Sequence, residues 1–136
     1  MDADAFGRAL EGAGFNLLVP EIERAMRFQS KVLGARVAYA DPDFAVVEGA
    51  GGRWLFHADH TYRDHPVYGI VTQLEGRGAG VELRLYHTDP DDAERRARAL
   101  GYTVLAGSAD KPHGLRECYL LDDDGYLWVP SIPLPE

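Results

Sequence analysis

The chain has 136 residues, 46% of them hydrophobic, and a formal net charge of -8 at pH 7. This length suits one domain with an ordinary apolar core. The negative charge argues against nucleic acid or an anionic membrane as the main partner. Cys118 is the single cysteine, which excludes an internal disulfide framework. Because no apolar run has membrane-spanning length and the acidic N-terminus lacks a signal-peptide core, we expect a cytoplasmic protein.

The first half of the chain predicts a β-α-β-β-β unit, preceded by a short helix within residues 4–11. The predicted elements are a strand at 15–19, a helix at 20–33 and strands at 35–40, 44–48 and 53–57. The helix has apolar residues at helical spacing and ends at Gly34. An Asp-Pro-Asp turn and a glycine-rich turn separate the later strands.

The second half repeats this order. The predicted elements are a strand at 81–86, a helix at 90–100 and strands at 102–106, 115–121 and 126–130. The first strand alternates strictly, so that Glu82, Arg84 and Tyr86 share one face and the intervening apolar residues share the other. Asp89 is the predicted N-cap of the helix. The proline-rich tail after residue 130 is not expected to continue a sheet interior.

Two units of the same order indicate an internal repeat. We predict an α+β fold of two βαβββ modules, at about residues 14–58 and 80–132, within one domain. The modules are expected to form a curved mixed sheet with a concave pocket, and the helices to cover its convex face. Residues 59–79 have the composition of a loop or crossover linker.

These features together resemble the vicinal oxygen chelate superfamily, the group of glyoxalases, bleomycin-resistance proteins and extradiol dioxygenases. The resemblance rests on the element order, on the Leu-Gly endings of both predicted helices, and on the closing Asp-Gly-Tyr turn at 124–126. It covers about residues 15–132. It implies a small-molecule pocket, a divalent metal in the metal-using members, and a pocket that modules from two chains complete.

The metal ligands of the family transfer only in part to this sequence. The position on the first strand falls at Gly14 or Phe15, and the one on the last strand falls at Val129. None of these side chains binds a metal. Glu82 could bind one, and the remaining position falls at Phe56 or His57. We therefore expect no metal or other cofactor; if a divalent metal is bound, His57, His60 and Glu82 are the candidates.

The histidines between residues 57 and 65 have two interpretations. With Asp59, they could form a displaced metal or acid–base cluster. Alternatively, His57, His60 and His65 belong to a polar loop and pack against rings or bond to the backbone. Our prediction is the second arrangement for the cluster, whereas His57 alone stays open between the two.

Glu82 needs a partner if it lies inside the sheet, because burying a lone charge is costly. Arg84 or Arg116 could provide that partner, and the sequence does not decide between an ion pair and a ligand or catalytic base. Cys118 is expected to be a buried, inert thiol. The ligand-binding candidates are Glu82, Arg84, Tyr86, His57, Trp54, Arg116, Tyr119 and Trp128.

The favoured hypothesis is a metal-free small-molecule-binding protein of the bleomycin-resistance type, which sequesters an aromatic or cationic compound. The alternative is a metal-dependent lyase, isomerase or dioxygenase of the glyoxalase type, and a third is a non-catalytic interaction module. The sequence leaves open whether any reaction is catalysed. We also predict a homodimer with pockets near its interface, as the resemblance implies; the apolar tail residues Trp128, Val129, Ile132 and Leu134 would contribute to the contact.

Overall fold

The computed structural model describes residues 2–136 and contains two βαβββ modules, which confirms the predicted α+β class. Module 1 consists of β1 (Asn16–Val19), α2 (Ile22–Lys31), β2 (Arg36–Ala40), β3 (Phe44–Gly49) and β4 (Gly52–Ala58). Module 2 consists of β5 (Glu82–Tyr86), α4 (Pro90–Ala99), β6 (Thr103–Asp110), β7 (Leu115–Leu121) and β8 (Leu127–Pro133). A short helix, α1 (Ala3–Ala9), precedes them, as predicted. No helix within residues 2–136 is long and apolar enough to span a bilayer.

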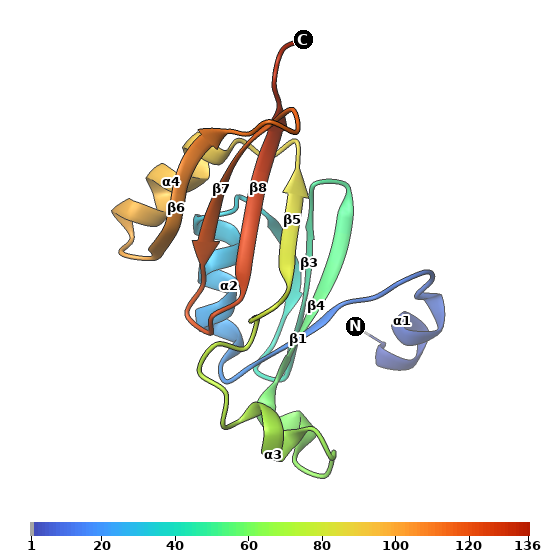
Figure 1. Cartoon of the computed structure of the whole chain (residues 1–136). Helices are drawn as coiled ribbons and strands as arrows, with labels where there is room; N and C mark the ends of the chain where they lie inside the picture. Colours follow the sequence, from blue (N-terminus) through green and yellow to red (C-terminus); the bar gives the residue numbers. More distant parts are fainter. Residues whose placement is uncertain (1) are drawn as a thin grey trace.

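The eight strands form two four-stranded sheets, not one continuous sheet. Sheet 1 has the order β1-β4-β3-β2, and sheet 2 has the corresponding order β5-β8-β7-β6 (Figure 1). In each sheet the first strand runs parallel to the last strand of its module, whereas the other pairs are antiparallel. Over the described residues, β1 and β5 each end a sheet, so one edge of each has no strand partner within the chain.

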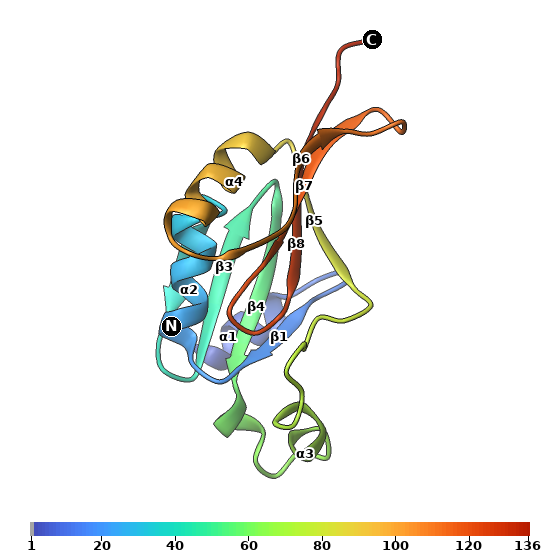
Figure 2. The same cartoon turned by 60° about the vertical axis from the view of Figure 1, so that its left-hand side comes forward.

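The two modules share a single hydrophobic core. Trp54 of β4 contacts Trp128 of β8, with ring centroids 5.7 Å apart. The helices also meet, since Arg96 of α4 donates to the carbonyl oxygen of Val32 just after α2, at 2.9 Å (Figure 2). Each sheet therefore has an inner face toward the helices and this core, and an outer face on its other side. These two names are used below.

Local sequence accounts for α4 and for the inner face above it. The Asp89 side chain accepts a hydrogen bond from the backbone nitrogen of Asp91 at 2.9 Å, and Pro90 begins the helix. Ala93 and Ala97 are fully buried. Cys118 of β7 is also buried, and burial raises the pKa of its thiol to about 11. The thiol is therefore protonated and shielded, which agrees with the predicted inert cysteine.

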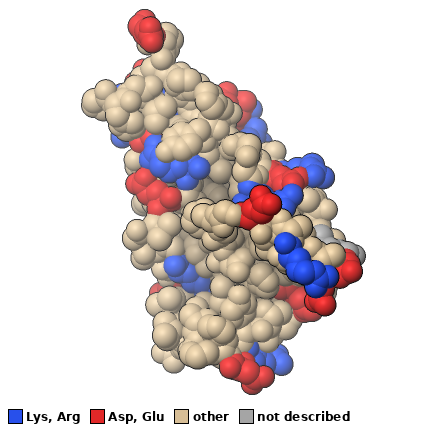
Figure 3. All heavy atoms as spheres, turned by 90° about the vertical axis from the view of Figure 1, so that its right-hand side faces the viewer, with Lys and Arg blue, Asp and Glu red and all other residues tan. Residues whose placement is uncertain are grey.

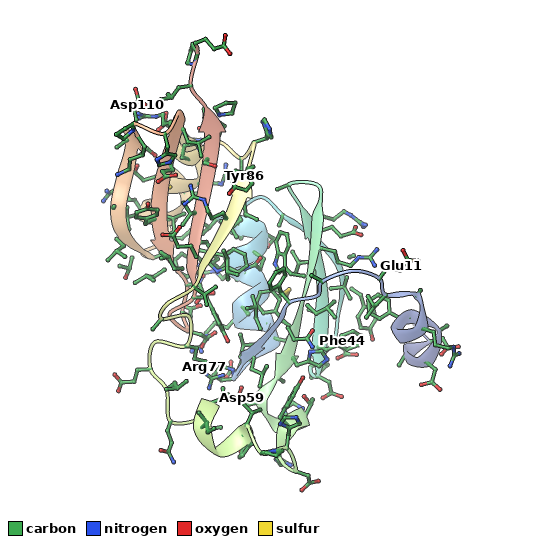
Figure 4. All side chains as sticks on the ribbon, turned by 45° about the vertical axis from the view of Figure 1, so that its right-hand side comes forward. Glu11, Phe44, Asp59, Arg77, Tyr86 and Asp110 are labelled. Carbon is green, nitrogen blue, oxygen red and sulfur yellow. The ribbon has the colours of Figure 1, made fainter. Side chains whose placement is uncertain are left out.

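The segment between the modules is more ordered than the predicted loop. It contains a short 3-10 helix, η1 (Asp59–Tyr62), and one helical turn, α3 (Tyr68–Val71). Arg77 then donates two hydrogen bonds to Asp59, both at 2.7 Å, and one to the carbonyl oxygen of Leu18 at 3.0 Å (Figure 4). A side chain at Gly78 would lie 2.7 Å from the Tyr126 backbone, so only glycine fits there. The linker therefore contacts module 1 through Arg77 and module 2 through Gly78.

The C-terminal tail continues sheet 2 through Pro133, contrary to the prediction from its prolines. The strand tolerates Pro130 because its pairing with β7 passes from Trp128 directly to Ser131, so the proline has a partner only on the β5 side, where it pairs with Leu85. Trp128 and Val129 are buried in this strand. They are therefore not available as the exposed dimer surface that the sequence suggested.

Candidate functional site

The outer face of sheet 2 carries a network of charged side chains that begins on β5. The alternation of this strand places Leu85 in the core and turns Glu82, Arg84 and Tyr86 to the outer face. Val81, which precedes the strand, is 55% exposed and does not join the helix layer as predicted. Figure 4 shows Tyr86 at the edge of the sheet.

Glu117 of β7 is the centre of this network. It is only 1% exposed, and the Arg84 Nη2 atom donates to its Oε2 atom in close contact. The Tyr119 hydroxyl donates to Oε1 at 2.8 Å, and His113 Nε2 lies 3.3 Å from Oε2. Burial alone would raise the pKa of the Glu117 carboxyl, but these bonds hold it below its ordinary value. Glu117 is therefore a buried carboxylate.

Arg84 links this buried carboxylate to an exposed one. Its Nη1 atom donates to Glu82 Oε1 at 2.8 Å, and its guanidinium carbon lies 5.8 Å from the centroid of the Tyr86 ring. Burial opposes the charge of Arg84, but the two carboxylates outweigh it and raise the pKa of the guanidinium. The Glu82 side chain is 46% exposed. Of the two roles that the sequence left open for Glu82, the buried ion pair is made by Glu117, whereas Glu82 pairs with Arg84 at the surface.

Three of the predicted site residues lie on the inner faces of the sheets, away from this network. Arg116 bonds to Asp91 at the start of α4 and to Asp110, so it lies on the helix side and is no partner for Glu82. Trp54 belongs to the core, where its indole nitrogen donates to Gln29 of α2 at 2.9 Å. Trp128 is 1% exposed in the same core. The reason is the alternation of side chains along a strand: each of the three residues lies on the same face of its strand as neighbouring core residues.

The outer face of sheet 1 has a different character, because aromatic rings replace the charges. His57 of β4 stacks on Phe44 of β3 with ring centroids 5.8 Å apart, and the edge of Tyr62 approaches it at 5.8 Å. Its Nδ1 atom is buried and has no hydrogen-bond partner among the described residues. Burial lowers the pKa of the imidazole below its ordinary value. His57 is therefore a neutral ring in an apolar setting.

The other histidines of this region do not converge on His57. His60 Nε2 lies 2.7 Å from Asp43, and the His65 Nδ1 atom accepts from the backbone nitrogen of Val67 at 3.1 Å. Glu82 is on the outer face of the other sheet. Across residues 2–136, no three His, Cys, Asp or Glu side chains gather in a way that could hold a metal ion. The candidates His57, His60 and Glu82 therefore do not fit a metal within one chain.

Helix α1 lies over the outer face of sheet 1. Phe6 approaches Phe44 with ring centroids 6.4 Å apart, and the Arg53 guanidinium lies 5.9 Å from the centroid of the Phe6 ring. Residues 9–16, at the end of the helix and after it, line a cavity of about 670 Å³ together with Glu48, Arg53 and the start of β4. Figure 4 shows Phe44 directed toward this part of the chain.

An apolar cleft of about 290 Å³ separates the free edges of the two sheets. Leu17, Trp54 and Trp128 contribute to its lining, and so do Glu82, Arg84 and Tyr86 of β5. Phe15 is 59% exposed and Tyr86 is 51% exposed beside it. Figure 3 shows uncharged surface in the middle of this side of the molecule, with charged groups on either side.

The family follows from the match of this sequence to a family description over residues 13–129, which covers module 1, the linker and module 2 as far as the first residues of β8. The chain belongs to the glyoxalase/bleomycin resistance protein/dioxygenase superfamily. The predicted resemblance is thereby confirmed. No curated protein matches the sequence.

Solved structures of this superfamily have the same fold. A glyoxalase/bleomycin resistance protein/dioxygenase from Nocardioides is 23% identical, with a TM-score of 0.65 over 96% of this chain and 89% of its own. TioX from Micromonospora sp. ML1 is 20% identical, with a TM-score of 0.65 over 93% and 98%. The fosfomycin resistance protein FosX from Listeria monocytogenes is 16% identical, with a TM-score of 0.65 over 90% and 93%. At these identities the likeness shows the fold alone.

Sequence reasoning missed two buried polar residues on the outer face of sheet 2, Glu117 and Ser131. Ser131 is fully buried and pairs with Glu117 across β7 and β8, and its hydroxyl has no partner within residues 2–136. A signal for Glu117 existed: it alternates with Cys118 and Leu120, so it occupies the face opposite the core residues of its strand. For Ser131 no signal existed, because the prolines around it suggested an irregular tail.

Proposed function

We propose that the protein binds a small aromatic or cationic molecule against the outer face of sheet 2, without a metal ion. The observation that carries this proposal is the network around Glu117. Buried polar side chains that bond to one another form a rigid base. Above that base, Glu82 and Tyr86 remain exposed and can take a ligand's charge and its flat surface.

The proposal includes a homodimer that completes the site. The free edges of β1 and β5 and the exposed apolar residues Phe15, Val81 and Tyr86 support a second copy as the occupant of this region. In a two-fold symmetric dimer, β1 of each protomer would lie beside β5 of the other, so the same contact would form twice. The outer face of sheet 1, with α1 over part of it, would then lie toward the charged outer face of the partner's sheet 2.

The donor set supports binding without metal. Gly14 and Val129 occupy two of the four family ligand positions and bring no donor atom. The alternative, a metal-dependent lyase, isomerase or dioxygenase, requires stoichiometric metal in the purified protein. Elemental analysis after dialysis against a chelator decides between the two. Metal that stays bound in the parent protein but is lost in Glu82→Ala would refute the metal-free proposal.

Calorimetric titration with three compounds of one ring system tests ligand binding: acridine, the cation N-methylacridinium and the anion acridine-9-carboxylate. We expect at least one to bind, and Tyr86→Leu to weaken it about tenfold because the exposed ring is lost. Leu105→Ala is the matched control, since Leu105 is 59% exposed on β6. Failure of all three compounds to bind the parent protein refutes this proposal.

Light scattering tests the dimer. We expect twice the monomer mass, and a monomer for Phe15→Glu, because a charge is placed in the apolar contact. Leu105→Glu is the control, since Leu105 and Phe15 are equally exposed at 59%. A monomer mass for the parent protein over the accessible concentrations contradicts the dimer.

The proposal also includes the location of the protein. The buried free cysteine fits a reducing compartment, and we propose the cytoplasm.

A further inference from the structure

The electrostatics of sheet 2 depend on a side chain that no ligand can touch. Glu117 is 1% exposed, so its carboxylate meets protein groups and not the solvent. Arg84 is the only basic group bonded to both Glu117 and Glu82 among the residues that the structure describes. Both of its terminal nitrogens already donate to carboxylates. Arg84 is therefore poorly placed to receive an additional anion.

The remaining basic groups of this face also have partners. The Lys111 ammonium lies 5.9 Å from the centroid of the Tyr119 ring, and His113 Nε2 lies 3.3 Å from the Glu117 carboxylate. Both come from the hairpin between β6 and β7. Glu82, by contrast, is 46% exposed and lies on the edge strand beside the exposed ring of Tyr86. Beside Tyr86, the more accessible charge is thus the negative one of Glu82, since the Arg84 side chain is only 22% exposed.

We propose that Glu117 determines the charge selectivity of this site: because it shares Arg84 with Glu82, the single positive charge does not neutralise both carboxylates, and the exposed Glu82 selects an organic cation. This inference rests on the proposed ligand-binding function and adds the ligand's charge to it. The cation would contact Glu82 while a flat part of the molecule covers Tyr86. Glu117 is a positioning residue that acts through Arg84, because it does not reach the ligand.

The decisive variant is Glu117→Gln, which keeps the size of the side chain and an oxygen for Arg84 but removes one negative charge. We expect N-methylacridinium to bind about tenfold more weakly and acridine-9-carboxylate about tenfold more tightly. Neutral acridine should keep its affinity within about twofold, because no charge interaction changes for it. A merely structural role for Glu117 would weaken all three compounds alike, and that outcome overturns the proposal.

The double variant Arg84→Gln/Glu117→Gln is the matched control. It removes one positive and one negative charge, so the net charge of the face stays as in the parent protein. We expect it to prefer the cation again, whereas loss of the preference in both variants overturns the role of the pair. Circular dichroism establishes that each variant is folded, and the double variant gives an answer even if Glu117→Gln alone does not fold.

The two proposals fail in different ways. If none of the three compounds binds the parent protein, the ligand-binding function is refuted and the selectivity falls with it. If the parent protein binds the anion or the neutral compound best, the ligand-binding function stands and the selectivity is overturned. The same holds if Glu117→Gln leaves the preference for the cation unchanged.

Discussion

The outer faces of the two sheets differ although the sheets have the same topology. Where sheet 1 pairs Phe44 with His57, sheet 2 pairs Glu117 with Ser131. These pairs are equivalent if Trp54 and Trp128, which meet in the shared core, are superposed. The inner faces of both sheets carry hydrophobic residues, because both must pack against the same core. The outer faces are free of that constraint, so the repeat can carry an aromatic surface on one module and a charged surface on the other.

The similarity of the inner faces can be tested with the largest expected effect. Trp54→Ala and Trp128→Ala should each reduce the free energy of unfolding by about 3–5 kcal/mol, because each leaves a cavity in the shared core. Urea denaturation followed by circular dichroism measures both. A loss for one variant only would show that the modules do not share their core equally.

The outer faces should respond differently to single substitutions. Arg84→Met leaves the Glu117 carboxylate buried and uncompensated, so we expect a loss of about 3 kcal/mol in the free energy of unfolding. Phe44→Leu keeps the sheet 1 surface apolar and should cost only about 1 kcal/mol. Denaturant titrations of the two variants give the comparison. Equal losses would contradict the contrast between a charged and an aromatic face.

The pH dependence of stability separates the two faces further. The pKa values of His57 and Glu117 are both lowered by folding, so each contributes stability that is present above its ordinary pKa and lost as the pH falls toward its folded pKa. The ordinary values are 6.5 for His57 and 4.5 for Glu117. The loss due to His57 therefore begins at higher pH.

Thermal melts across this pH range measure the effect. His57→Phe should lose less stability than the parent protein when the pH first falls below 6.5. Glu117→Gln should follow the parent there and differ only below 4.5. If both variants depart from the parent profile over the same pH range, the assignment of these groups is wrong.

The smallest effect concerns α1, which covers only sheet 1. No residue of this helix is buried within the described chain, and Phe6 makes its ring contact with Phe44. Deleting residues 2–12 should therefore reduce the free energy of unfolding by less than about 1 kcal/mol. Chemical denaturation checks this value. A larger loss would mean that the aromatic face of sheet 1 depends on its cover.

Much of the fold could be predicted from local sequence. Strict alternation over residues 81–86 predicted β5 and its two faces, and Asp89 with Pro90 predicted the start of α4. These signals are reliable because the backbone period and the capping bonds involve only neighbouring residues. The linker and the tail were predicted less well. The bond between Arg77 and Asp59 and the position of Pro130 in β8 depend on contacts between distant parts of the chain, which form only when the chain folds.

The candidate site depended on tertiary structure for most of its members. The sequence by itself determined that Glu82, Arg84 and Tyr86 share one face of a strand, since that follows from the strand period. Only the folded structure decided that Arg84 reaches Glu117 on β7 while Arg116 bonds to Asp91 on the helix side. Residues on separate strands meet according to the register between those strands, and long-range packing sets that register.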